Sequence, residues 1–267
     1  MLKKRMSRRA FMMDIGKGGL AVAVFGVTAF ACSSDEPTAS STTAAANPIP
    51  TTAPPSTTPQ TTTPQTTAAI SDPLAWERVN LGFVSAYVLA RGGEAAIVDT
   101  GVAGSEGEIE ASLGVLGLGW SDVGHVIVTH LHDDHQGSLP AVMNLAPDAT
   151  GYAGAADIAG ISSPRELAAV GDGDNVFDLT IIATPGHTPG HISVIDVQNG
   201  LLVAGDALNG ADGGVIGANP DFTADIVAAD QSIAKLARFS YDTVVFGHGE
   251  PVVGDASVQV AMLSASL

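Results

Sequence analysis

Cysteine is almost absent from this sequence: Cys32 is the only one among 267 residues. A folded region formed by the rest of the chain therefore contains no disulfide bond. It also has no thiolate to offer a metal ion, so that any metal ligands there must be histidine, aspartate or glutamate side chains.

Basic residues are scarce beyond the N-terminal segment. Residues 1–69 hold six of the 11 Lys and Arg and three of the 28 Asp and Glu, which leaves five basic and 25 acidic residues. Nucleic-acid affinity comes largely from Lys and Arg side chains that displace counterions from phosphate groups. A region with this charge balance repels phosphate backbones, so we expect no nucleic-acid partner.

The apolar run that follows the N-terminal basic residues is also short. Gly18–Cys32 has 15 residues, whereas a membrane-spanning helix needs about 20. With basic residues before it, the run is typical of a signal peptide. SRRAFM, with Arg8 and Arg9, resembles the twin-arginine export signal, and AFAC, ending at Cys32, resembles a lipobox. We predict that residues 1–32 are a signal peptide and that the chain is an exported cell-envelope protein, anchored to the membrane by lipid on Cys32. An uncleaved anchor with a chance cysteine is the alternative.

Residues 33–70 consist almost entirely of Thr, Ser, Pro and Ala. The segment has no apolar periodicity and cannot form a core, because it has too little apolar surface to bury. We predict a disordered linker over residues 33–70 and a single folded domain over residues 71–267.

Apolar strand patterns alternate with helical patterns through the folded domain. Strands are expected over 76–82, 85–101 with a break at Gly92-Gly93, 123–129, 179–184, 192–197, 201–208 and 242–249. Helices are expected over 105–119, from just after His135 to 145, over 223–239 and over 255–266, with Ile226, Ile233, Leu236 and Ala237 on one side of the third. Strands that alternate with helices predict sheets covered by helices.

Polar, chemically active residues follow four of these apolar strands. Residues 130–135 contain three histidines and two aspartates, although the whole chain has seven histidines. In an extended segment, residues two apart point to the same side, so His130 and His132 can bind one ion. Asp134 and His135 follow as the chain turns, and point towards a second ion. The ligands from the other strand ends are His187, Asp206 and His248.

Imidazole and carboxylate groups suit zinc and neighbouring divalent metals. Two such ions lying close together need a shared anionic ligand, which Asp206 can supply. The two remaining histidines, His125 and His191, are expected on the surface or in the core rather than at the metals.

At these motifs the sequence resembles the metallo-β-lactamase fold superfamily of metal-dependent hydrolases. HLHDDH matches its His-x-His-x-Asp-His signature, TPGHTPGH the later histidine motif, AGDAL the bridging aspartate and FGHGEP the final histidine. The likeness covers about residues 81–253. It implies an α+β fold, a four-layer αββα sandwich, with the site at one edge between the two sheets.

The resemblance also implies a role for each ligand. It assigns two groups of three and one bridge: His130, His132 and His187; Asp134, His135 and His248; and Asp206. Asp99, in VDTG, is expected beneath the histidine turn, where it orients ligands without binding metal. Two divalent ions are expected, with zinc the first choice and iron or manganese as alternatives.

A water molecule between two cations ionises near neutral pH, which supplies hydroxide to attack a carbonyl carbon. Asp134 is the predicted catalytic residue, because it can steady the leaving group or pass it a proton. No nucleophile-elbow motif is present. We therefore predict a hydrolase that cleaves an ester, thioester, lactone or related acyl bond in a small molecule.

Several relatives remain as alternatives. A persulfide dioxygenase would use one iron on the positions of His130, His187 and Asp206. The β-lactamases of the superfamily usually have cysteine or serine at the position of Asp206. Glyoxalase II and the acyl-homoserine lactonases share the full ligand set, but five basic residues suit a glutathione thioester poorly. A non-catalytic metal-binding surface protein is the last alternative.

The substrate pocket is expected to be lined by residues 151–175 and 209–222. Phe83, Tyr152 and Phe222 are candidates for an apolar lining, with core packing as the alternative for each. The shortage of cationic groups favours a neutral or apolar acyl substrate over a polyanion.

Overall fold

The computed structural model describes residues 72–267. The predicted signal peptide (1–32) with its lipid-bearing Cys32 and the predicted linker (33–70) lie outside the described residues. Among the helices that are described, none has the length and apolar character required to span a bilayer.

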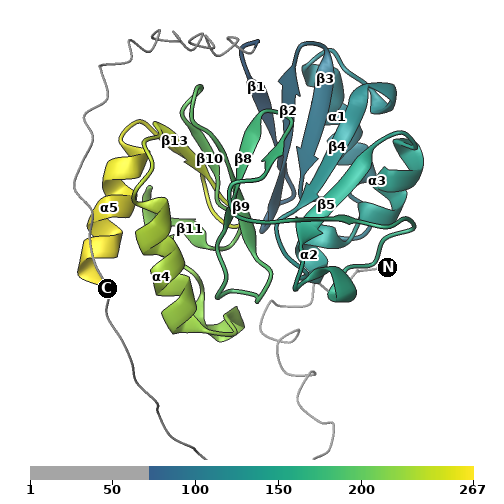
Figure 1. Cartoon of the computed structure of the whole chain (residues 1–267). Coiled ribbons are helices and arrows are strands. Elements are labelled where there is room, and N and C mark those ends of the chain that lie inside the picture. The colour runs from purple at the N-terminus through teal and green to yellow at the C-terminus, as the bar shows by residue number, and fades with distance from the viewer. Residues whose placement is uncertain (1–71) are drawn as a thin grey trace, which may run out of the picture. The chain divides into compact units, whose positions relative to one another are not determined.

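The first sheet has six strands in the order β1-β2-β3-β4-β5-β6 (Figure 1). Their bounds are β1 Ala75–Asn80, β2 Ser85–Arg91, β3 Glu94–Val98, β4 Val123–Val128, β5 Thr150–Gly154 and β6 Ala168–Val170. The first three are antiparallel, and β2 and β3 are joined by Gly92-Gly93, both at positive φ, as a tight hairpin turn requires. From β3 onwards the strands are parallel, so the chain must cross over between them.

Helices make the first two of those crossovers and cover the outer face of the first sheet. Helix α1 (Glu106–Val115) connects β3 to β4. The short helix α2 (Asp133–Gln136) and helix α3 (Leu139–Leu145) lie between β4 and β5. The buried side chains of α1 and α3, among them Ile109, Leu113 and Leu139, pack against the sheet.

The second sheet also has six strands, in the order β14-β13-β10-β9-β8-β7. Their bounds are β7 Asn175–Val176, β8 Leu179–Ala183, β9 Ile192–Asp196, β10 Leu201–Val203, β13 Thr243–Val245 and β14 Val252–Val253. The one parallel pair, β10 and β13, is connected through a hairpin of β11 (Leu208–Ala211) with β12 (Gly214–Gly217) and then α4 (Ile226–Leu236). Helix α5 (Ala256–Ser266) follows β14.

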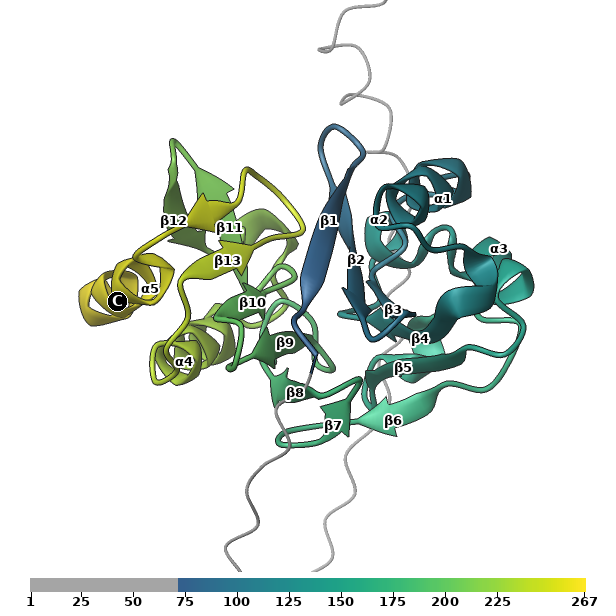
Figure 2. The ribbon, with the colours of Figure 1, turned by 90° about the horizontal axis from the view of Figure 1, so that it is seen from above.

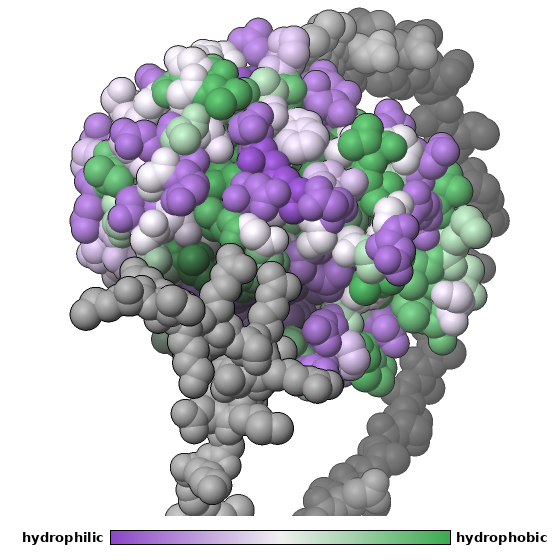
Figure 3. Space-filling view, turned by 180° about the vertical axis from the view of Figure 1, so that it is seen from behind, coloured by the Kyte–Doolittle hydropathy of each residue, from purple (hydrophilic) through white to green (hydrophobic). Residues whose placement is uncertain are grey.

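The two sheets face each other, with α1 and α3 outside one and α4 and α5 outside the other (Figure 2). The layer between the sheets is apolar, and its buried residues include Leu89, Ile127, Ile181, Val194 and Val203. Full burial of one such side chain contributes about 1.5–3 kcal/mol. The two facing sheets with helices outside each confirm the predicted four-layer αββα sandwich. On the outer surface seen from behind, hydrophilic and hydrophobic residues are interspersed (Figure 3).

Two local predictions need correction. The helix expected to begin after His135 is divided: α2 already begins at Asp133. The helix is interrupted at Gly137, where a Cβ atom would lie 2.5 Å from the Asp133 oxygen and from the Ala103 nitrogen. Ile226, expected on the apolar side of its helix, is exposed. It is the first residue of α4, and the buried face starts one turn later with Ala229.

Candidate metal centre

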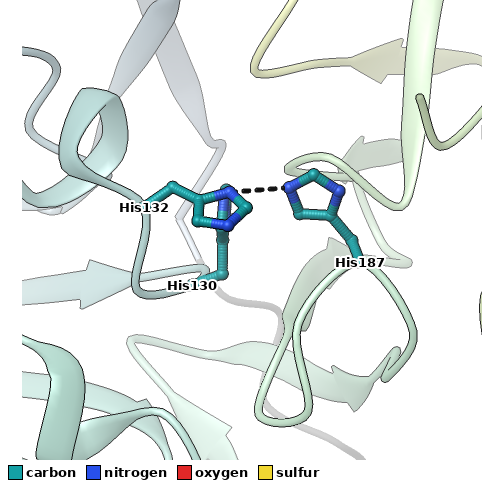
Figure 4. Close-up of side chains that lie close together, drawn as sticks. All are labelled: His130, His132 and His187. Carbon is teal, nitrogen blue, oxygen red and sulfur yellow. Dashed lines mark hydrogen bonds between the residues drawn. The ribbon is translucent and has the colours of Figure 1, made fainter. Parts of the chain in front are cut away.

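Three histidines from two distant segments converge at the ends of their strands. His130 and His132 follow β4, and His187 lies in the loop between β8 and β9. The His132 Nδ1 atom is 3.1 Å from His130 Nε2 and 3.0 Å from His187 Nε2. The rings stand nearly perpendicular to one another, with their nitrogens turned inwards (Figure 4). Three inward nitrogens so close together could hold one metal ion.

A second group combines Asp134, His135 and His248. Helix α2 carries Asp134 and His135, and His248 follows β13. The His248 Nε2 atom is 3.4 Å from Asp134 Oδ2. The side chains of Asp134 and His248 are 29% and 32% exposed, whereas His135 is fully buried. This group therefore forms the open side of the centre, where a substrate can enter.

Asp206 lies between the two groups, shortly after β10. Its Oδ1 atom is 3.4 Å from His135 Nε2. Its Oδ2 atom is 3.4 Å from His187 Nε2 and 3.2 Å from His248 Nε2. One carboxylate thus contacts a histidine of the first group and two of the second, as a shared ligand must.

The chemistry of two buried atoms fits a cation at this place. His135 Nε2 and Asp206 Oδ1 are buried and have no hydrogen-bond partner. Unpaired buried polar atoms cost free energy and are uncommon in folded proteins. A divalent cation coordinated by both atoms would remove that cost. The donor set of imidazole and carboxylate is also one that binds zinc, iron and manganese.

The electrostatics differ between the buried histidines. Burial, assisted by the neighbouring histidines, lowers the pKa of His130, and burial lowers the pKa of His187 to about 4. Both are therefore neutral at pH 7, the form that binds metal. Burial also acts to lower the pKa of His135, but the carboxylates of Asp206 and Asp99 outweigh it and raise this pKa to about 9.

For Asp206, burial acts to raise the pKa, and His135 together with His248 overcomes this effect and lowers it. Without metal, a protonated His135 accordingly balances the charge of the Asp206 carboxylate. A metal ion and this proton compete for the same nitrogen.

Asp99 supports the turn that contains His130, His132 and His135. It follows β3 with φ of 61°, and its Oδ1 atom accepts a hydrogen bond from Thr129 N at 2.7 Å. Its Oδ2 atom lies 2.8 Å from His135 Nδ1 and accepts a bond from the Thr129 hydroxyl. The Nδ1–H of His135 thus points to Asp99, which leaves Nε2 facing Asp206. These contacts agree with the predicted position of Asp99.

Asp157 is a supporting residue that the sequence reasoning missed. It is completely buried, between β5 and the 3₁₀ turn Ile158–Gly160. Its Oδ2 atom accepts hydrogen bonds from Leu131 N at 3.2 Å and from the Thr188 hydroxyl at 2.5 Å. Its Oδ1 atom accepts one from Gly190 N at 2.7 Å. The only available signal was a lone acid within the uncharged stretch GYAGAADIAGI.

The two histidines predicted not to be ligands lie outside the three possible metal-binding groups. His191 is buried, and its Nε2 atom accepts a hydrogen bond from the Asp206 backbone N–H at 3.0 Å. Its Nδ1 atom lies 2.8 Å from the Thr184 hydroxyl. His191 therefore positions the backbone of the bridging residue. His125 is half-buried, 3.2 Å from the Tyr152 hydroxyl.

The model of one protein family, the Metallo-beta-lactamase superfamily, matches residues 79–248. The chain belongs to this superfamily. The match begins in β1 and ends at His248, so it includes both histidine groups and Asp206. The matched region therefore contains all the candidate ligands and most of the sandwich fold.

Individual relatives are similar over part of their length. The chain is 30% identical over 148 residues to the uncharacterized protein YobT of Bacillus subtilis. This match covers 46% of this chain and 61% of YobT. It is 35% identical over 130 residues to the hydroxyacylglutathione hydrolase of Erwinia tasmaniensis, or 45% of either chain. The chain thus spans about half the length of these relatives.

A solved structure shows the same fold. The metallo-beta-lactamase family protein TTHA1429 from Thermus thermophilus superimposes with a TM-score of 0.60 at 24% identity, over 72% of this chain and 78% of that one.

Proposed function

We propose that this member of the superfamily is a hydrolase that cleaves an ester, thioester, lactone or related acyl bond in a small molecule. The observation that carries the proposal is the position of Asp206, whose carboxylate contacts both histidine groups. Two divalent cations, with zinc the first choice, would be held by His130, His132 and His187 on one side and by Asp134, His135 and His248 on the other. Bound there, they would lower the pKa of a water molecule and polarise the substrate carbonyl.

The chain's own residues prepare the site for this chemistry. Burial keeps His130 and His187 neutral, so their nitrogen lone pairs stay available. Asp99 and His191 fix the orientation of His135 and Asp206 by hydrogen bonds. Asp134 is the catalytic residue in this proposal: it lies on the open side, where its carboxylate can hold a proton and deliver it to the leaving group.

Three other functions agree less well with the site. A mono-iron persulfide dioxygenase would need only His130, His187 and Asp206, which leaves the complete second group unexplained. A β-lactamase is disfavoured by the aspartate at position 206. A metal-binding protein without activity gives no reason for the open side at Asp134 and His248.

Removal of the bridging carboxylate tests the proposal. The purified full chain is expected to contain two equivalents of metal by elemental analysis and to hydrolyse members of a panel of esters, thioesters and lactones. Asp206→Ala should lose at least one metal ion and lower hydrolysis by about 10³-fold or more. The matched control is His125→Ala, which removes a histidine outside the metal groups. Unchanged metal content and turnover in Asp206→Ala would refute the proposal, and oxygen uptake with a persulfide would support the dioxygenase instead.

We also propose that the chain is exported and anchored to a membrane through lipid on Cys32. The proposal rests on SRRAFM and AFAC in the sequence. Labelling of cells with a radioactive fatty acid should mark the wild-type chain and leave Cys32→Ala unlabelled. Export that persists in an Arg8→Lys/Arg9→Lys double variant would contradict the twin-arginine route.

A further inference from the structure

Two exposed phenyl groups adjoin the metal centre. Phe83, in the turn between β1 and β2, is 63% exposed, and Phe222, at the end of the 3₁₀ turn Pro220–Phe222, is 68% exposed. Single exposed apolar residues are common on protein surfaces. These two are unusual because Phe83 contacts a histidine of the centre and Phe222 directly precedes a residue that contacts another. The third candidate, Tyr152, packs against the core and contacts His125, which agrees with the alternative given for it.

Phe83 is held by His248. The carbonyl oxygen of Phe83 accepts a hydrogen bond from His248 Nδ1 at 2.6 Å. The phenyl ring lies nearly parallel to the imidazole ring, with centroids 6.3 Å apart and planes 17° apart. His248 belongs to the group on the open side of the centre. The phenyl group therefore stands at the rim of that opening.

Phe222 directly precedes the two residues that contact His187. The hydroxyl of the next residue, Thr223, lies 3.3 Å from His187 Nδ1. Ala224 N donates a hydrogen bond to the His187 carbonyl at 3.1 Å. The following residues Ile226 and Val227 are also exposed. An apolar segment is thus attached directly to the loop that supplies His187.

The histidines near the two phenylalanines contact the same carboxylate oxygen. Asp206 Oδ2 is 3.2 Å from His248 Nε2 and 3.4 Å from His187 Nε2. Phe83 contacts the first histidine, and Phe222 is one residue from a contact of the second. Exposed apolar residues therefore belong to the segments that contact two of the histidines around Asp206.

No cationic side chain of residues 72–267 is placed to bind an anionic substrate at this rim. Arg78 is paired with Glu250 and Arg91 with Asp196. Arg165 donates to backbone carbonyls, and Lys235 is paired with Asp172. The fifth basic residue, Arg238, follows the last turn of α4. This helix starts just after the Phe222 segment, and its 11 residues make it about 16 Å long. Arg238 is therefore at the opposite end of the helix from Phe222.

We infer that the substrate is an uncharged ester or lactone whose apolar acyl chain lies against Phe83 and Phe222. The inference rests on the proposed hydrolase function and names its substrate class. In the reaction, water adds to the acyl carbon and the acyl C–O bond breaks. The products are a carboxylate, an alcohol and one proton. Phe83 and Phe222 determine specificity by covering apolar chain surface that water would otherwise contact.

A matched pair of substrates tests the charge preference. The zinc-loaded full chain is assayed with the 4-nitrophenyl ester of hexanoic acid and with the corresponding ester that carries a carboxylate at the far end of the same chain. We expect kcat/KM to be about tenfold higher, or more, for the uncharged ester. Equal values, or a preference for the anionic ester, would overturn the inference.

Chain-length dependence tests the two phenylalanines. We expect kcat/KM for 4-nitrophenyl octanoate to exceed that for the acetate about tenfold or more, because a longer chain buries more apolar surface. Phe83→Ala and Phe222→Ala should each reduce this ratio several-fold, and Phe→Leu at either position should restore most of it. Phe83→Ala keeps the carbonyl that holds His248. Val258→Ala, which truncates an exposed apolar residue on α5, is the matched control and should leave the ratio unchanged.

A binding experiment separates this inference from the proposed function. Calorimetry with acetohydroxamic and octanohydroxamic acid measures affinity for the zinc-loaded full chain without turnover. We expect about tenfold or tighter binding of the longer compound, and loss of this difference in the Phe83→Ala/Phe222→Ala variant. If the preference is present but no acyl substrate is hydrolysed, the proposed function fails and the apolar subsite stands. If hydrolysis occurs without any chain-length preference in rate or binding, the inference alone fails.

Discussion

The Asp157 carboxylate accepts a hydrogen bond from the Gly190 backbone N–H at 2.7 Å, across 33 residues of sequence. Gly190 lies in the loop that carries His187. The other oxygen of the same carboxylate accepts a bond from Leu131 N, between His130 and His132. One buried side chain thus connects the two segments whose histidines must meet. A Cβ atom at position 190 would lie 2.7 Å from Asp157 Oδ1, so the contact also requires glycine there.

Asp157→Ala should therefore weaken the first metal-binding group. Three donors would lose their acceptor in a buried place, which costs about 1–3 kcal/mol for each donor left unpaired. We expect zinc affinity to fall about 10–100-fold, as for other residues that orient metal ligands. Competition with a chromophoric chelator measures it. Asp174→Ala, which removes an exposed carboxylate that also accepts a backbone N–H, is the control. Equal zinc affinity of Asp157→Ala and wild type would show that the connection does not position the histidines.

Zinc binding should release a proton at neutral pH. Burial acts to lower the pKa of His135, but Asp206 and Asp99 raise it to about 9, so His135 is protonated at pH 7 in the metal-free protein. Its Nε2 atom must lose the proton before it can bind zinc. Calorimetric titrations in buffers of different ionisation enthalpy should show about one proton released at pH 7 and few at pH 10. His135→Ala should remove the pH-dependent part. Equal heats in all buffers at pH 7 would contradict a protonated His135.

Acid should destabilise the metal-free protein through His191. Burial lowers the pKa of His191 to about 3, below the usual value of 6.5. Between these pH values the unfolded chain binds more protons than the folded chain, so stability falls as pH falls from 6.5 towards 3. The slope is up to about 1.4 kcal/mol per pH unit for each such histidine. Urea unfolding with chelator present, between about pH 7 and 5, measures the slope. His191→Asn should reduce it by about 1 kcal/mol per pH unit; an unaltered slope would assign the acid sensitivity to other groups.

The sequence predicted the ligands better than their supports, for a physical reason. His130 and His132 are two apart in an extended segment, and His187, Asp206 and His248 each follow an apolar strand, so local pattern alone places them at strand ends. The position of Asp157 depends on tertiary contacts with Leu131 and Gly190, which no local pattern encodes. The strand and helix pattern likewise predicted sheets covered by helices, and the resemblance to the superfamily implied the four-layer order.

Features that depend on close packing were harder to predict. The division between α2 and α3 falls at Gly137, where a Cβ atom would lie 2.5 Å from the Ala103 nitrogen. The apolar spacing predicted the helix that contains Ile226, but it did not predict that the buried face of α4 starts only at Ala229. The rim position of Phe83 depends on its backbone bond to His248, 165 residues away.

Gly247, in the FGHG motif, should be required for the bridging carboxylate. A Cβ atom at this position would lie 2.2 Å from Asp206 Oδ1 and 2.4 Å from His135 Cε1. Both side chains are buried; Asp99 holds the His135 ring and His191 holds the backbone N–H of Asp206, so there is little room for either residue to move away. Gly247→Ala should therefore displace Asp206 and lower the bound zinc from two equivalents to one or fewer, as elemental analysis would report. The control is Gly107→Ala, on helix α1, where an added methyl group meets no atom within 4 Å. That change should keep both metal ions and raise stability by up to about 1 kcal/mol, because alanine favours helices more than glycine. Two full equivalents of zinc in Gly247→Ala would mean that the Asp206 carboxylate can bridge from another position.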